Sequence, residues 1–150
     1  MKILVLITFI IIFSNQSAYS ENVKVVDGDT IKIGDEKIRF SGIDAPEINQ
    51  DCIQNGEKIS CGKLVKDVLI KKIGDEIPKC TIEGKDFYKR TLAECFVNNE
   101  SLSSYLVRNG YAFAYRKYSK KFIEDENFAK KNKLGLWSMK FKYPWEFRKL

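Results

Sequence analysis

The chain has 150 residues, a formal net charge of +6, four cysteines and no histidine. This length allows one domain with a hydrophobic core but not two. The lack of histidine excludes reactions that use an imidazole base and metal sites that use histidine ligands, and the basic balance favours a polyanionic partner.

The first 20 residues have the features of a signal peptide. Lys2 supplies a positive charge, residues 3–13 are apolar except for Thr8, and small residues precede position 21. The apolar run is shorter than the roughly 20 residues that cross a bilayer. We therefore expect a signal peptide at 1–20, cleavage, a secreted or periplasmic location, no membrane contact afterwards and a single domain over residues 21–150. A retained signal anchor is the alternative.

Three strands are predicted next, at residues 23–28, 29–34 and 36–42. Apolar and polar residues alternate on both sides of a turn signal at Gly34 and Asp35, which is typical of two antiparallel strands. This pairing brings the outer ends of the strands together. Those ends carry four acids, with one arginine between them: Asp27, Asp29, Asp44, Glu47 and Arg39.

The gathered acids have two interpretations. Taken alone, Asp27–Asp29 could simply form a turn and Ala45–Glu47 could simply mark the end of a strand. Arg39 could likewise form an ordinary surface ion pair with Asp44 or Glu47. Together, however, like charges repel unless a cation lies among them. Carboxylate oxygens with a backbone carbonyl are the ligands that calcium prefers. The sequence therefore favours a divalent metal site.

The remaining pattern predicts two further strands and three helices. Leucine, valine and isoleucine recur at helical spacing after Cys61, Ser101 is a suitable N-cap, and Gly110 and Gly135 are stop signals. Five strands with one helix inserted are typical of a Greek-key barrel of the oligonucleotide-binding (OB) type, in the α+β, mainly β class, with the helices packed against it. The expected strands are 77–83 and 91–97, and the expected helices are 61–73, 101–110 and 119–133.

Four cysteines in an exported protein predict two disulfides. Cys80 and Cys95 flank a predicted hairpin and should lie opposite each other, which leaves Cys52 and Cys61 to close the loop after Glu47. A zinc site is the competing interpretation. It is disfavoured because the chain has neither histidine nor a Cys-x-x-Cys pair.

The basic charge is concentrated near the C-terminus. From residue 111 onward there are eleven Lys/Arg and four Asp/Glu, which favours a surface that binds polyanions over an ordinary solvated helix face. The aromatic segment 143–147 could pack back onto the fold. A frayed basic end is the alternative.

The order of these motifs resembles the staphylococcal nuclease (thermonuclease) family. The resemblance rests on Asp-Gly-Asp-Thr at 27–30, on Arg39, on Asp-Ala-Pro-Glu at 44–47 and on Asp-Phe-Tyr-Lys-Arg-Thr-Leu-Ala at 86–93. It continues through residues 106–110 and the segments 129–130 and 134–137, and so covers nearly all of the chain after residue 21.

The resemblance implies specific roles. Asp29, Asp44 and the carbonyl of Ala45 would bind Ca²⁺, and Asp27 would act through a water molecule. The implied catalytic residues are Glu47, which would orient or deprotonate the attacking water, and the phosphate-binding arginines Arg39 and Arg90. The implied substrate contacts are Tyr88 and Tyr115.

The function expected from this resemblance is a monomeric, calcium-dependent endonuclease for DNA and RNA that leaves 3′-phosphate ends, with no protein partner. One alternative is a non-catalytic nucleic-acid-binding module of the same fold, and another is an exported protein that binds other polyanions. Phe87, Lys89 and the segment 52–61 depart from the family pattern. These departures bear on substrate affinity and on the choice between DNA and RNA.

Overall fold

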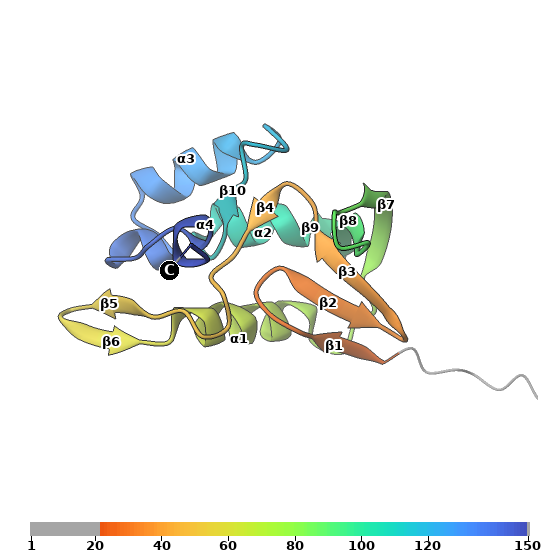
Figure 1. Ribbon diagram of the computed structural model, residues 1–150, viewed down its shortest axis with the longest axis horizontal. Helices are drawn as coiled ribbons and strands as arrows, with labels where there is room; N and C mark the ends of the chain where they lie inside the picture. Colours follow the sequence, from red (N-terminus) through yellow and green to blue (C-terminus); the bar gives the residue numbers. More distant parts are fainter. Residues whose placement is uncertain (1–21, 150) are drawn as a thin grey trace, which may run out of the picture.

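The computed structural model describes residues 22–149 (Figure 1), so the signal peptide expected at 1–20 lies outside the described residues. The main sheet follows the order β1–β2–β3–β8–β7, and β9 pairs with β8. Strands β3 and β8 run parallel, and the other pairs are antiparallel. The strands are β1 (Val23–Val25), β2 (Thr30–Ile33), β3 (Glu36–Phe40), β7 (Lys79–Lys85), β8 (Thr91–Val97) and β9 (Glu100–Ser101).

The predicted hairpin between β2 and β3 is confirmed. Gly34 adopts a positive φ of 56° in the turn, and Ile31 pairs with Ile38 while Thr30 pairs with Arg39. The first strand was predicted too long, because it ends at Val25. The amides of residues 26 and 27 instead bond back to the carbonyl of Thr30, so the chain turns before β2 begins.

The three predicted helices are present as α1 (Cys61–Ile73), α2 (Leu102–Arg108) and α3 (Ile123–Lys131). Helix α1 has the predicted bounds. The side chain of Ser101 caps α2 by accepting a bond from the amide of Ser104 at 3.2 Å. Helix α3 is shorter than the predicted range 119–133, because Ser119 accepts a turn bond from Lys121 and Lys133 has a positive φ of 52°.

Several short elements were not predicted. They are β4 (Ile43–Asp44) paired with β10 (Phe113–Ala114), the hairpin of β5 (Cys52–Gln54) and β6 (Glu57–Ile59), the 3₁₀ turn η1 (Gly135–Ser138) and α4 (Pro144–Phe147). Over residues 22–149 the path of strand pairing does not close from β7 back to β1. The strand-rich sheet with its helices otherwise confirms the predicted OB-type fold class.

The aromatic tail packs back onto the fold. The ring of Phe113 on β10 lies 5.0 Å from the rings of Phe141 and Tyr143 and 5.4 Å from that of Trp137. The amide and carbonyl of Lys140 also bond to Ile53 on β5. In Figure 1 the C-terminal segment accordingly lies between the β5–β6 hairpin and α3. None of the helices within the described residues is long and apolar enough to cross a membrane.

Candidate functional site

Two acids from separate strands meet at one arginine. Asp29 lies just before β2, Asp44 ends β4, and Arg39 projects from β3 between them. Arg39 donates to Asp29, and its second terminal nitrogen donates to Asp44 at 3.0 Å. Both acids are buried, with Asp44 fully shielded from solvent. The structure thus brings together Asp29, Arg39 and Asp44, which we call the acid–arginine cluster.

Hydrogen bonds and close packing hold the turn before β2 in place. The amide of Ala45 donates to Asp29 at 2.9 Å, and the amide of Asp29 donates to Asp27 at 3.1 Å. A Cβ atom on Gly28 would lie 2.7 Å from the side chain of Val65 on α1 and 2.8 Å from that of Ala45. Only glycine therefore fits here, and its close packing fixes the acids on either side.

Burial and charge set the ionisation of the cluster. Burial raises the pKa of Asp44, although hydrogen bonding to Arg148 opposes the rise. Burial and the nearby charge of Asp29 likewise raise the pKa of Asp27. For Arg39, burial alone would lower the pKa, but the charges of Asp29 and Asp44 outweigh it and raise the pKa further. Arg39 therefore stays charged at any pH that the fold tolerates.

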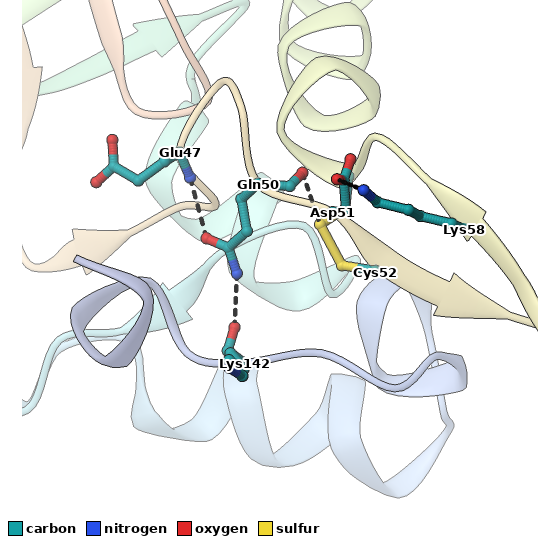
Figure 2. The surroundings of a disulfide bond; sticks show 7 residues. Glu47, Gln50, Asp51, Cys52, Lys58 and Lys142 are labelled. Carbon is teal, nitrogen blue, oxygen red and sulfur yellow. Dashed lines mark hydrogen bonds and ion pairs between the residues drawn. A yellow bond between two sulfur atoms is a disulfide. The ribbon is translucent and has the colours of Figure 1, made fainter. Parts of the chain in front are cut away.

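Glu47 is held through its backbone by a buried glutamine (Figure 2). The side-chain oxygen of Gln50 accepts from the amide of Glu47 at 3.2 Å, and its nitrogen donates to the carbonyl of Lys142 at 2.7 Å. Gln50 is fully buried. One side chain therefore joins the loop that carries Glu47 to the C-terminal tail, and nothing in the sequence marked this glutamine.

The same loop rests on the start of α1. Cys52 and Cys61 form a disulfide across it. A Cβ atom on Gly62 would lie 1.9 Å from the carbonyl oxygen of Glu47, so the helix approaches the loop as closely as the backbones allow. The second disulfide joins Cys80 to Cys95, which are register partners on β7 and β8. The structure therefore forms both disulfides that the sequence predicted.

A third arginine reaches the site from the far end of the chain. Arg148 donates to both oxygens of Asp44, at 3.1 and 2.7 Å, and to Glu47 at 2.7 Å. The sequence analysis missed this residue. Its only available signal was indirect, namely the aromatic segment 143–147, which holds the tail against the fold.

Arg90 lies in the same region but outside the acid–arginine cluster. Its Nε atom donates to Asp86 at 2.6 Å. Burial would raise the pKa of Asp86, but the bonds from the backbone and side chain of Arg90 outweigh burial and lower it. The neighbouring Tyr88 is largely exposed and lies under the Arg90 guanidinium, 5.6 Å from it.

One cavity of about 1120 Å³, which we call the site cavity, unites most of the expected residues. Asp44 is absent from its lining because it lies buried beneath the surface. Arg148 is an addition to the expected set. The cavity is lined by the expected residues Asp27, Asp29, Arg39, Ala45, Glu47, Tyr88, Arg90 and Tyr115.

The donor chemistry fits a hard cation in kind, because Asp27, Asp29 and Glu47 line the site cavity and carboxylate oxygens are the ligands that such a cation prefers. The negative charge of these acids is already partly neutralised, however. Asp29 and Asp44 form ion pairs with Arg39, and Asp44 also forms one with Arg148. Across residues 22–149 no group of three or more acidic or cysteine side chains is arranged to hold a metal ion. Access of a cation to Asp44 therefore depends on Arg148.

Comparison with known proteins agrees with this geometry. The family model described as "Staphylococcal nuclease homologue" matches residues 37–139. The chain is 31% identical over 117 residues to succinoglycan biosynthesis protein ExoI of Rhizobium meliloti, covering 75% of this chain and 61% of that protein. It is 31% identical over 116 residues to staphylococcal-like nuclease CAN1 of Arabidopsis thaliana, covering 75% of this chain and 33% of that protein.

A third relative is an uncharacterized endonuclease of Haemophilus influenzae, 29% identical over 148 residues, with 90% of this chain and 78% of that protein covered. The chain spans less than two thirds of the length of ExoI and CAN1. The family match nevertheless covers well over half of the chain, including Arg39, Glu47 and Arg90. The chain belongs to the staphylococcal nuclease family.

Proposed function

We propose that this protein is a calcium-dependent endonuclease that hydrolyses phosphodiester bonds of DNA and RNA and leaves 3′-phosphate ends. The observation that carries the proposal is the convergence of Arg39, Glu47 and Arg90 in one cavity directly above two buried aspartates. The nuclease names of the relatives support the same class of reaction.

Hydrolysis of a phosphodiester requires three things from the protein. The anionic phosphate must be neutralised, a water molecule must be activated, and the added charge of the five-coordinate transition state must be stabilised. Because the chain has no histidine, the activation of water would come from a carboxylate or from the bound cation. Glu47 lines the site cavity and is the carboxylate that we propose orients or deprotonates the attacking water.

The proposed ligands of calcium are Asp29, Asp44 and the carbonyl of Ala45, with Asp27 acting through a water molecule. Calcium held by these residues would supply positive charge to the phosphate and help to activate water. A free glutamate with a pKa near 4.3 is a weak base, so an alkaline optimum is expected.

The arginines neutralise the phosphate in this scheme. A guanidinium group stays charged and presents forked donors that match two phosphate oxygens, which a lysine cannot do. Arg90 faces the cavity from the β7–β8 hairpin, and its pairing with Asp86 through Nε sets its direction. Tyr88 and Tyr115 both line the site cavity and are the proposed contacts for phosphate and for base or sugar.

The disulfides Cys52–Cys61 and Cys80–Cys95 support a secreted or periplasmic location, because such bonds persist in oxidising compartments. We propose that residues 1–20 are removed as a signal peptide and that residues 21–150 act as a single, monomeric domain.

A second candidate function is a module that binds nucleic acid without cutting it. One observation favours it, since both oxygens of Asp44 are bonded to guanidinium groups. Incubation with supercoiled plasmid and with RNA, in calcium and then in chelator, separates the two. Calcium-dependent cutting supports the nuclease, and retarded migration without cutting supports the binding module.

A further inference from the structure

A second cavity lies on the other side of the ridge formed by Tyr115 and the C-terminal tail. It has a volume of about 620 Å³ and shares Tyr115 with the site cavity. Its walls come from the loop after β10, from α3, from η1 and from the tail. Three lysines stand around it, Lys117, Lys130 and Lys149, and we call it the lysine cavity.

The charge of the lysine cavity is positive and largely unpaired. Its single acid, Glu126, is buried and already engaged, because it accepts from the amide of Ala114 at 2.9 Å and forms an ion pair with Arg116. Within the described part of the chain, none of the three lysines forms an ion pair. All three residues are exposed. The ammonium of Lys130 lies 5.5 Å from the ring of Trp137 and that of Lys117 lies 5.4 Å from the ring of Tyr118, so their charges are held around the depression without being neutralised.

The aromatic wall of this cavity determines what it can bind. The indole of Trp145 is stacked on both faces, against Tyr143 at 4.5 Å and an interplanar angle of 10°, and against Tyr115 at 5.7 Å and 12°. A nucleotide base would need a free aromatic face for stacking. Trp145 offers none, and the ring of Trp137, the other indole in the lining, is contacted by the ammonium of Lys130 at 5.5 Å. The cavity therefore suits a charged backbone better than a base.

We propose that the lysine cavity is a subsite for the sugar–phosphate backbone of a single-stranded DNA or RNA segment that continues from the bond cleaved in the site cavity. The inference rests on the proposed function for the identity of the substrate. Tyr115 and the tail form the ridge that the strand crosses, since Arg148 lines one cavity and Lys149 lines the other. The lysines bind phosphates, so the subsite is insensitive to base sequence and sensitive to strand length.

The test compares two triple variants with equal loss of charge. The first replaces Lys117, Lys130 and Lys149 by glutamine. The control replaces Lys63, Lys71 and Lys131, exposed lysines that line neither cavity. Lys130 and Lys131 are neighbours on α3, which makes the comparison stringent.

The first readout is the salt dependence of binding to a fluorescent 20-nucleotide single strand, measured by anisotropy in chelator. Loss of three phosphate contacts should reduce the slope of log K against log salt by about 2, at roughly 0.7 per contact on a single strand. The control should keep a slope close to that of the unaltered protein. Equal slopes for the two variants would overturn the subsite.

The second readout is cleavage with calcium. The ratio of kcat/KM for the 20-nucleotide strand to kcat/KM for a dinucleotide should fall on the order of tenfold in the first variant, and an unchanged ratio would again overturn the subsite. If the unaltered protein binds but cuts neither substrate, the nuclease proposal fails while the slope still decides the subsite. If it neither binds nor cuts, both proposals fail.

Discussion

Arg148 and Asp44 are 104 positions apart in the chain, yet both terminal nitrogens of Arg148 donate to the Asp44 carboxylate. The tail thus places a positive charge where a cation bound to Asp44 would also need to lie. The positive charge of Arg148 on both oxygens of Asp44 repels a calcium ion bound to the same carboxylate, so the two compete.

Arg148→Gln is therefore expected to tighten calcium binding by at least about tenfold, because it removes a positive charge within a few ångströms of the proposed ligands. Isothermal titration of calcium measures this without substrate. Lys142→Gln removes an exposed lysine of the same tail and should leave the dissociation constant nearly unchanged. Weaker calcium binding in Arg148→Gln would refute the competition.

The catalytic roles predict losses in turnover. Glu47→Gln keeps the shape of the side chain but removes the base, and Arg39→Lys removes the forked donors that hold both aspartates. Each should lower kcat by at least about a hundredfold. The control Glu57→Gln alters an exposed glutamate of β6 and should keep full activity. Steady-state cleavage of a single-stranded substrate is the measurement, and a fully active Glu47→Gln would remove that residue from the mechanism.

Gln50 should be important for stability and for turnover. Gln50→Leu leaves the amide of Glu47 and the carbonyl of Lys142 without their partner in the interior, at a cost of about 2–4 kcal/mol. Gln54→Leu, the same replacement on β5, should change the free energy of unfolding by less than about 0.5 kcal/mol. Urea denaturation with both disulfides intact compares them. Equal stability of the two variants would show that Gln50 does not tie the tail to the loop.

Asp27 provides a test of the electrostatics. Burial and the charge of Asp29 raise the pKa of Asp27 in the folded protein. The unfolded chain, with a pKa of 3.8, therefore loses this proton at a lower pH than the folded protein does. The free energy of unfolding falls as the pH rises from 3.8 towards the folded pKa. Asp27→Asn retains an oxygen for the amide of Asp29. The variant should be more stable than the unaltered protein at neutral pH, and the difference should vanish below the unfolded pKa. Denaturation in chelator, measured about every half pH unit between pH 3.5 and pH 7, records this difference in the free energy of unfolding. A difference that grew on acidification would have the wrong sign.

The sequence predicted that Asp29, Arg39 and Asp44 lie together, but it predicted the surrounding elements less well; the roles of these residues stay predictions. Asp29, Arg39 and Asp44 were foreseen because alternation and one turn signal determine a hairpin, and a hairpin determines which ends meet. The disulfides followed from the same logic of register. Arg148 was missed because its partner Asp44 lies 104 residues away. Gln50 was missed because its bond to the tail spans 92 residues, and local patterns carry no information on such contacts.

The missed boundaries have a similar cause. The predicted first strand was too long because the amides after Val25 bond to Thr30. The predicted third helix was too long because a turn bond to Ser119 precedes it. Side-chain patterns do not reveal such bonds. The strands β4 and β10 have two residues each, too few for any periodicity. They nevertheless carry Asp44 and support its burial.

The central claim is that the acids near Arg39 hold a divalent cation for phosphodiester hydrolysis. The most direct measurement is cleavage of supercoiled plasmid and of RNA by the purified protein while calcium is titrated against a chelator. The account predicts cutting that appears with calcium, disappears with chelator and leaves 3′-phosphate ends. Cutting that persists in chelator, or retention of both substrates intact at saturating calcium, would contradict it.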